Sequence, residues 1–252
     1  MGNEVPFRVV SDEKRIWVIK HSTSVDSEKR ELLGFLLGKE FCNVCEVELL
    51  NKHSLEELKQ FAYPHESFST SNTCLVRLAH SNSLEELPCK TIEEAVATEL
   101  VYSIWIRRRD TTLDNRVYIK GIPMFFDFHI AFLGEADLAD INVFYSQNQD
   151  HGRAGLWRVK IWNDFLTQFT GTIDPIQVGT THFINSMPAF YQQVDKSKTT
   201  LKRKLANKIE AIVNQVNFSI EVEEQIIDFL INNLNTLDSD VNKMLKVLRK
   251  DS

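Results

Sequence analysis

Residues 107–134, RRRDTTLDNRVYIKGIPMFFDFHIAFLG, decide the interpretation of this chain. Asp110 is followed after four residues by Asn115, which gives a D-x-x-x-x-N spacing. Two β-rich runs, RVYI and IPMFFDF, come next and are joined by Lys-Gly, so a hairpin is predicted there. Asp127 lies in the second run between phenylalanines. An acid in so apolar a run is expected to be buried and to need a partner or a metal.

The chain before this segment is predicted to form a small sheet with one helix. Lys20 ends a β-rich run in the triplet Val-Ile-Lys, and the run before it pairs with it as a hairpin. In the stretch 27–39, apolar residues would face several directions of a helix, which predicts that this helix is buried. Its acids come early and its lysine late, as the helix dipole favours. The predicted elements are strands at 7–10, 16–20, 44–50 and 73–79, and a helix at about 27–39.

The chain from residue 91 onward is predicted to be mostly helical. Thr91 and Glu94 form a T-x-x-E capping box, which predicts a helix that starts at this point. The polar stretch 80–90 precedes it and is the expected lobe boundary. Ser219 and Asp238 are expected N-caps. Further helices are predicted near 156–169, 199–217, 219–234 and 238–249.

Taken in order, these motifs resemble the protein-kinase-like superfamily. The match is to its atypical branch, which contains HipA-like kinases and the phosphatidylinositol 3-/4-kinase catalytic core. Lys20 falls on the strand lysine, the D-x-x-x-x-N spacing on the catalytic loop, and Asp127-Phe128-His129 on the D-F-G-type triplet. Arg108 stands in the histidine place of H-R-D, and Thr111-Thr112 replace the Arg-His of the atypical loop. The resemblance covers roughly residues 5–135.

The resemblance implies an α+β fold with two lobes. The small β-rich lobe would span residues 1–80 with one helix. The mostly helical large lobe would span residues 81–252 and carry the catalytic loop and the metal-binding hairpin.

The resemblance also implies an ATP- and Mg²⁺-dependent phosphotransferase. Asp110 would be the catalytic carboxylate, and Asn115 and Asp127 would hold Mg²⁺ through hard oxygen ligands. Lys20 would pair with the α- and β-phosphates of ATP. A glutamate on the next helix would hold Lys20, with Glu31 preferred over Glu28, although both also fit a solvated helix face. The adenine hinge would be the backbone at Leu78, Ala79 and His80.

Three classes of function stay open from the sequence. A HipA-like kinase would act on protein Ser/Thr, with lipid or small-molecule acceptors as alternatives. A pseudokinase that serves as an interaction module is favoured by the lack of a glycine-rich loop, because the first hairpin turn, Ser11-Asp12-Glu13-Lys14, carries two acids instead. A metal-dependent hydrolase would use Asp110 and Asp127.

Composition sets the remaining expectations. The 252 residues carry a net charge of −6, so a general nucleic-acid binder is not expected. No apolar run is long enough for a membrane span and no signal-peptide pattern is present, which predicts a cytoplasmic protein without integral membrane association. A protein substrate or partner is compatible with the kinase resemblance. The oligomeric state stays open.

Two further patterns have structural interpretations. Cys42, Cys45, Cys74 and Cys89 lack a second pair at zinc-site spacing, so reduced, partly buried thiols are expected. The run of arginines at 107–109 fits either a helix C-terminus or a patch for an acidic substrate. The stretch LKRKLANKIEAIV at 201–213 is predicted to be a basic amphipathic helix with a solvated face.

Overall fold

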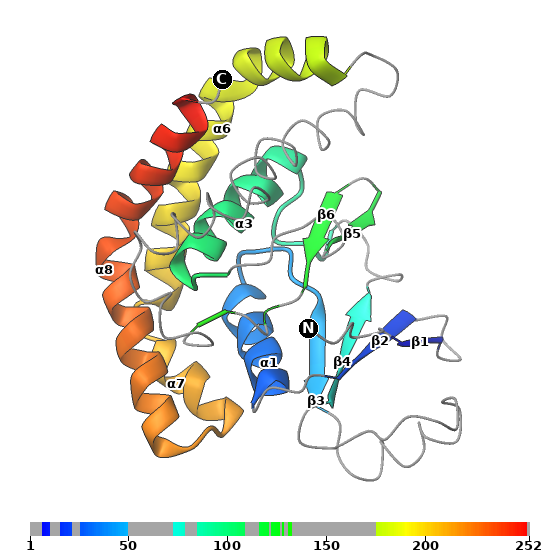
Figure 1. Cartoon of the computed structure of the whole chain (residues 1–252), viewed down its shortest axis with the longest axis vertical. Coiled ribbons are helices and arrows are strands. Elements are labelled where there is room, and N and C mark those ends of the chain that lie inside the picture. The colour runs from blue at the N-terminus through cyan, green and yellow to red at the C-terminus, as the bar shows by residue number, and fades with distance from the viewer. Residues whose placement is uncertain are drawn as a thin grey trace.

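The computed structural model describes residues 7–10, 16–21, 26–49, 73–78, 85–108, 116–120, 122–126, 128, 131–132 and 175–250. Four strands form one antiparallel sheet in the order β1-β2-β4-β3 (Figure 1). They are β1 (Phe7–Val10), β2 (Ile16–His21), β3 (Glu46–Leu49) and β4 (Thr73–Leu78). The hairpin and both later strands were predicted, and the pairing confirms the hairpin.

Helix α1 (Ser27–Gly38) connects β2 to β3 and confirms the predicted helix. It packs against β3 on one side and against the short helix α7 (Ile209–Val213) on another (Figure 1). Both of its candidate glutamates are buried, with 6% of Glu28 and 1% of Glu31 exposed. The alternative of a solvated helix face is therefore wrong for both residues.

The other helices form the larger part of the described chain. Figure 1 shows α6 (Pro175–Leu205) and α8 (Ile220–Lys250) side by side, with α3 (Ile92–Trp105) against them. A 3-10 turn (Asn214–Val216) follows α7. Thr91 Oγ1 accepts a hydrogen bond from the backbone N–H of Glu94 at 3.2 Å, which confirms the predicted start of α3. Within the described residues, no helix has the length and apolar character needed to cross a membrane.

The C-terminal helices differ from the prediction in three ways. Helix α6 begins at Pro175, well before the predicted start at 199. Helix α6 ends at Leu205, and a turn separates it from α7, so the predicted helix at 199–217 is interrupted. Helix α8 runs unbroken through Asp238, so the predicted N-cap there is wrong. The Asp238 carboxylate instead pairs with Lys202 on α6 at 2.5 Å, and this contact lowers the pKa of Asp238. The predicted helix at 156–169 lies outside the described residues.

The second hairpin is confirmed as β5 (Arg116–Ile119) paired with β6 (Ile122–Phe125). Lys120 in its turn has a positive φ of 48°, as expected for a two-residue hairpin turn. The end of β6 also pairs with the chain that follows α1. Phe125 N–H donates to the Asn43 carbonyl oxygen at 2.8 Å, and Cys45 N–H donates to the Phe125 carbonyl oxygen at 2.8 Å.

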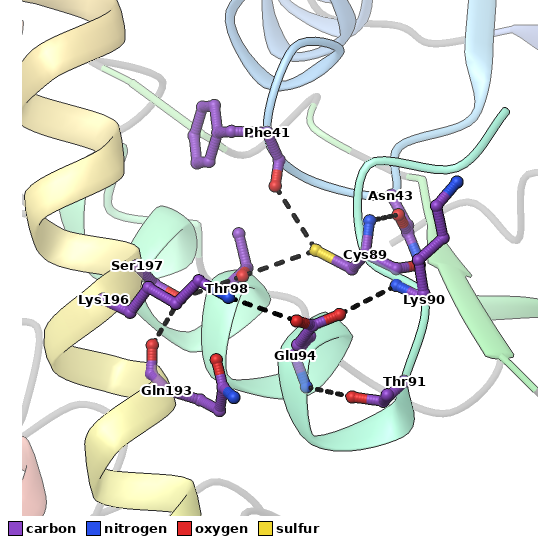
Figure 2. A network of polar contacts seen from close by, with 10 residues as sticks. All are labelled: Phe41, Asn43, Cys89, Lys90, Thr91, Glu94, Thr98, Gln193, Lys196 and Ser197. Atoms are coloured by element: carbon purple, nitrogen blue, oxygen red, sulfur yellow. Dashed lines mark hydrogen bonds and ion pairs between the residues drawn. The ribbon is translucent and has the colours of Figure 1, made fainter. Parts of the chain in front are cut away.

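The side chain of Asn43 joins three segments that are distant in sequence. Figure 2 shows its contact with Cys89. Its Oδ1 accepts from Cys89 N–H at 2.9 Å, and its Nδ2 donates to the carbonyl oxygens of Cys89 at 3.0 Å and Pro123 at 3.2 Å. Asn43 is fully buried. This amide therefore ties the chain after α1 to the segment before α3 and to β6.

A chain of buried polar groups continues from Cys89 into the helices (Figure 2). Cys89 Sγ lies 3.4 Å from the Phe41 carbonyl oxygen and 3.5 Å from Thr98 Oγ1. Thr98 Oγ1 lies 3.0 Å from Ser197 Oγ on α6. Burial raises the pKa of the Cys89 thiol. The three described cysteines, Cys42, Cys45 and Cys89, are buried reduced thiols outside any disulfide, which confirms the prediction for them.

Replacing Asn43 tests the joint that it forms between the chain after α1, the segment before α3 and β6. Asn43→Ala removes three buried hydrogen bonds and leaves the Cys89 and Pro123 backbone groups without this partner, at about 1–3 kcal/mol each at most. We expect a loss of about 3 kcal/mol in the free energy of unfolding, measured by urea denaturation.

The control is Asn232→Ala on the exposed face of α8, for which a change within about 0.5 kcal/mol is expected. Equal urea midpoints for the two variants would contradict the role assigned to Asn43.

Candidate active site

Helix α1 contacts the segment that contains Asp127. The Glu31 carboxylate Oε2 accepts a hydrogen bond from the backbone N–H of Phe128 at 2.9 Å, across 97 residues of sequence. Glu31 is 1% exposed and Phe128 is fully buried. Because a carboxylate is a strong acceptor for a buried N–H, this bond fixes the backbone directly after Asp127 relative to α1.

The Phe128 ring fills a space that α1 leaves open at Gly34. A Cβ at Gly34 would overlap this ring, so glycine is required by the close approach. The Tyr102 ring of α3 lies edge-on to Phe128 at 5.9 Å between centroids. Tyr102 Oη donates to the Gly34 carbonyl oxygen at 2.5 Å, and burial raises the pKa of Tyr102 well above its usual range, so the hydroxyl keeps its proton. Together these contacts lock α1, α3 and Phe128.

The C-terminus of α3 turns sharply and separates two arginines. Arg108 N–H donates to the Ser103 carbonyl oxygen at 2.9 Å, and Arg107 N–H donates to the Ile104 carbonyl oxygen at 3.4 Å. This pattern is a Schellman motif, in which the residue after the C-cap is left-handed. Arg107 takes that place with φ of 53°, where glycine is the usual residue. The reversal gives the two arginines different sets of partners.

Arg108 contacts the residues on both sides of Asp127. Its Nη2 donates to the Phe126 carbonyl oxygen at 2.5 Å, and its guanidinium lies 5.0 Å from the Phe128 ring centroid. Its Nη1 lies 3.0 Å from Glu99 Oε1 on α3. Arg108 is 1% exposed and Glu99 is 4% exposed. The buried charge is therefore paired, as a guanidinium in the interior requires.

Arg107 contacts α8 instead. Its Nη2 lies 2.8 Å from Asp240 Oδ2 and donates to Asn233 Oδ1 at 3.2 Å. Asn233 Nδ2 in turn donates to the Trp105 carbonyl oxygen at 2.8 Å, at the end of α3. A patch for an acidic substrate is therefore wrong for Arg107 and Arg108, because both side chains are buried and ion-paired. Arg109 lies outside the described residues.

The predicted site residues are described only in part. Lys20 lies on β2 opposite Cys74, and Leu78 ends β4 opposite Ile16. Glu31 contacts Phe128, as described above. Five further predicted site residues lie outside the described residues: Asp110, Asn115, Asp127, Ala79 and His80. Their roles, and the pairing of Glu31 with Lys20, stay predictions.

No sequence pattern predicted the role of Glu99 or the contacts of Arg108. Glu99 belongs to the predicted helix that starts at Thr91, and Arg108 belongs to the arginine run. The two residues are nine positions apart, a spacing that does not place side chains on the same face of a helix. The turn at the end of α3 brings them together, and no local sequence pattern specifies that geometry.

Glu28, the alternative partner for Lys20, is buried without full compensation. Among the described residues, its Oε2 has no hydrogen-bond partner. Desolvation by burial raises the pKa of Glu28 above its usual value, although a bond to its own backbone amide opposes this shift.

Two hollows of about 270 Å³ each flank the Asn43 joint. One is bordered by Asn43 and Met124, and the other lies between α3 and α6 next to Thr98 and Ser197. Within the described ranges, no group of three or more His, Cys, Asp or Glu side chains could hold a metal ion. The metal site predicted from sequence uses Asn115 and Asp127, which these ranges do not include.

No protein-family model and no curated protein matches the chain. Among solved structures, the chain is similar to the crystal structure of a Helicobacter pylori proinflammatory kinase, CtkA. The sequences are 12% identical, the match covers 95% of this chain and 89% of that chain, and the TM-score is 0.46. A likeness of this degree does not indicate an activity. Evidence about function therefore comes from the motifs and from the contacts of Glu31 and Arg108.

Replacing Glu31 tests its hold on Phe128. Glu31→Ala leaves the buried Phe128 N–H without this acceptor, and we expect a loss of about 2–3 kcal/mol in the free energy of unfolding by urea denaturation. Glu31→Gln keeps an acceptor oxygen and is expected to lose about 1 kcal/mol. Equal losses for the two variants would show that the hydrogen bond to Phe128 contributes nothing.

The raised pKa of Glu28 predicts that the free energy of unfolding depends on pH. Because its pKa is raised in the folded state, the ionised group destabilises the fold as pH rises through the interval between its unfolded and folded pKa. Glu28→Gln should therefore stabilise the protein by about 1 kcal/mol at pH 7, because it removes an orphaned buried charge. The gain should vanish below the ordinary glutamate value of 4.5.

Urea unfolding of Glu28→Gln across pH 3.5–7.5 is the measurement. Glu224→Gln on the exposed face of α8 is the matched control and should show no gain at any pH. A gain for Glu28→Gln that does not change with pH would rule out ionisation as its cause.

Proposed function

We propose that the protein is an ATP- and Mg²⁺-dependent phosphotransferase of bilobal, protein-kinase-like architecture, with a small lobe at 1–80 and a helical lobe at 81–252. The observation that carries the proposal is the hydrogen bond from Phe128 N–H to Glu31 at 2.9 Å. It joins the helix expected to support Lys20 to the backbone next to Asp127. Protein Ser/Thr is the proposed acceptor.

A second contact supports the same arrangement. Arg108 precedes Asp110 by two residues and contacts Phe126 and Phe128 on both sides of Asp127. The start of the proposed catalytic loop therefore lies against the proposed metal-binding segment. Phosphoryl transfer needs this kind of positioning more than covalent help from the protein.

The donor groups fit Mg²⁺ rather than a softer metal. Asp127 and Asn115 would supply a carboxylate and an amide oxygen, and Mg²⁺ commonly takes one or two such protein ligands together with phosphate oxygens. Phe128 is fully buried and Phe126 partly so. An acid in so apolar a run of sequence is expected to need a partner. When bound, Mg²⁺ would neutralise charge on the nucleotide phosphates. Asp110 would orient the acceptor hydroxyl, and Lys20 would bind the α- and β-phosphates.

A pseudokinase that binds nucleotide without turnover is the second candidate. It is favoured by the first hairpin turn, 11–14, which has two acids and no glycine where a kinase would cover the phosphates with a glycine-rich loop. The two candidates share a nucleotide site and differ in the role of Asp110.

Calorimetry of Mg·ATP binding and a radiolabelled ATP assay test the proposal together. We expect Asp127→Asn to abolish Mg·ATP binding without unfolding the protein, because a neutral amide replaces the charged metal ligand. Asp110→Asn should keep Mg·ATP binding and lose phosphoryl transfer to protein acceptors.

Asp195→Asn is the control, because Asp195 lies on the exposed surface of α6 and should affect neither measurement. Mg·ATP binding by the wild type without transfer to any acceptor would favour the pseudokinase. Unchanged Mg·ATP affinity in Asp127→Asn would overturn the assignment of Asp127 as a metal ligand.

A further inference from the structure

We infer that Arg108 is a positioning residue that fixes the segment around Asp127 for metal binding. The identity of the ligand rests on the proposed function, whereas the positioning itself rests on contacts of described residues. Arg108 contacts the backbone before Asp127 and the ring after it, at 2.5 Å from the Phe126 carbonyl oxygen and 5.0 Å from the Phe128 centroid.

The geometry of these contacts requires an arginine. One guanidinium nitrogen bonds the Phe126 carbonyl oxygen while another bonds Glu99, and the central carbon of the group lies over the Phe128 ring. A planar fork with several fixed donors satisfies all three at once, which the point charge of lysine cannot do. Cation–π contacts of this kind strengthen when the cation is desolvated.

The Glu99 carboxylate compensates the positive charge of the buried Arg108 guanidinium. It lies on α3, which also supplies Tyr102 against Phe128, so the carboxylate is fixed by a rigid element. The Schellman turn then returns Arg108 towards Glu99. The ion pair of Arg108 with Glu99 therefore ties the start of the proposed catalytic loop to α3. The bond of Arg108 to the Phe126 carbonyl oxygen ties it to the segment around Asp127.

Phe128 is held by contacts to its ring and to its backbone. Arg108 and Tyr102 lie against its ring, and Glu31 of α1 accepts its N–H. Loss of the Arg108 contacts would remove the bond to the Phe126 carbonyl oxygen and leave Phe128 held by Glu31 and Tyr102. In such a variant we therefore expect the Asp127 carboxylate to be less well placed, which would weaken metal binding without abolishing it.

The neighbouring Arg107 provides a matched control. It is equally buried and paired with a buried carboxylate, Asp240, at a similar distance, but its described partners are in α8 and at the end of α3. Arg107→Lys and Arg108→Lys should therefore lower thermal stability to a similar extent, while only Arg108→Lys should affect the segment around Asp127.

The first measurement is native-state amide hydrogen exchange of the peptide covering residues 126–132, without any ligand. We expect exchange about tenfold faster in Arg108→Lys than in the wild type, and unchanged exchange in Arg107→Lys. If Arg108→Lys fails to fold, the neutral double variant Glu99→Gln/Arg108→Gln replaces it, with Asp240→Asn/Arg107→Gln as its control. Equal exchange in the two variants would overturn the inference.

The second measurement is the Mg²⁺ concentration that gives half-maximal ATP binding. Arg108→Lys should raise it about tenfold, whereas Arg107→Lys should leave it unchanged. No change in Arg108→Lys would overturn the link between Arg108 and the metal. The exchange experiment needs no nucleotide. A wild type that binds no Mg·ATP would therefore overturn the proposed function, while the exchange comparison would still decide whether Arg108 fixes the segment.

Discussion

Burial of α3 is the constraint on which the rest of the structure depends. From Ala95 onward the helix is almost wholly excluded from water, because α6, α8 and β6 all pack against it. A buried polar group without a partner costs about 1–3 kcal/mol, so the polar side chains of α3 need partners on its neighbours. Those partners fix where the neighbours lie: Thr98 pairs with Ser197 of α6, Tyr102 with Gly34 of α1, and Trp105 Nε1 with the Leu230 carbonyl oxygen of α8.

The chain after α6 adds a second support for α1. Lys29 of α1 lies 5.6 Å from the Phe218 ring centroid, and Glu40 after α1 pairs with Lys208 at 2.9 Å. The ion pair is exposed and contributes little, since surface pairs are worth about 0–1 kcal/mol. The buried side chains of Ile209 and Val213 on α7 provide the larger contribution. As a result, the helix that carries Glu31 rests on the sheet, on α3 and on the C-terminal helices at once.

Most elements could be predicted from the sequence, because each has a local cause. The capping box at Thr91 starts α3, the Lys-Gly turn closes the β5-β6 hairpin, and alternating β-rich runs give β1 and β2. The error at Asp238 is equally instructive. An acid with a further acid in the following turn fits an N-cap, but its carboxylate pairs with Lys202 of another helix, a contact 36 residues away that no local pattern contains. The same limit applies to Arg107 and Arg108, whose run resembles a surface patch until Asp240 and Glu99 are placed beside them.

The sequence by itself determined strands β1 to β6, helix α1 and the start of α3, because spacing and local propensity are local properties of the chain. The motif residues Lys20, Asp110, Asn115 and Asp127 also come from the sequence, and their roles stay predictions. Only the tertiary structure decided that Glu31 accepts from Phe128, that Asn43 joins three distant segments, and that two adjacent arginines have different partners. The physical reason is that burial removes water as a partner. Most buried polar groups then pair with whatever the fold brings within about 3 Å, and that neighbour is set by packing rather than by sequence distance.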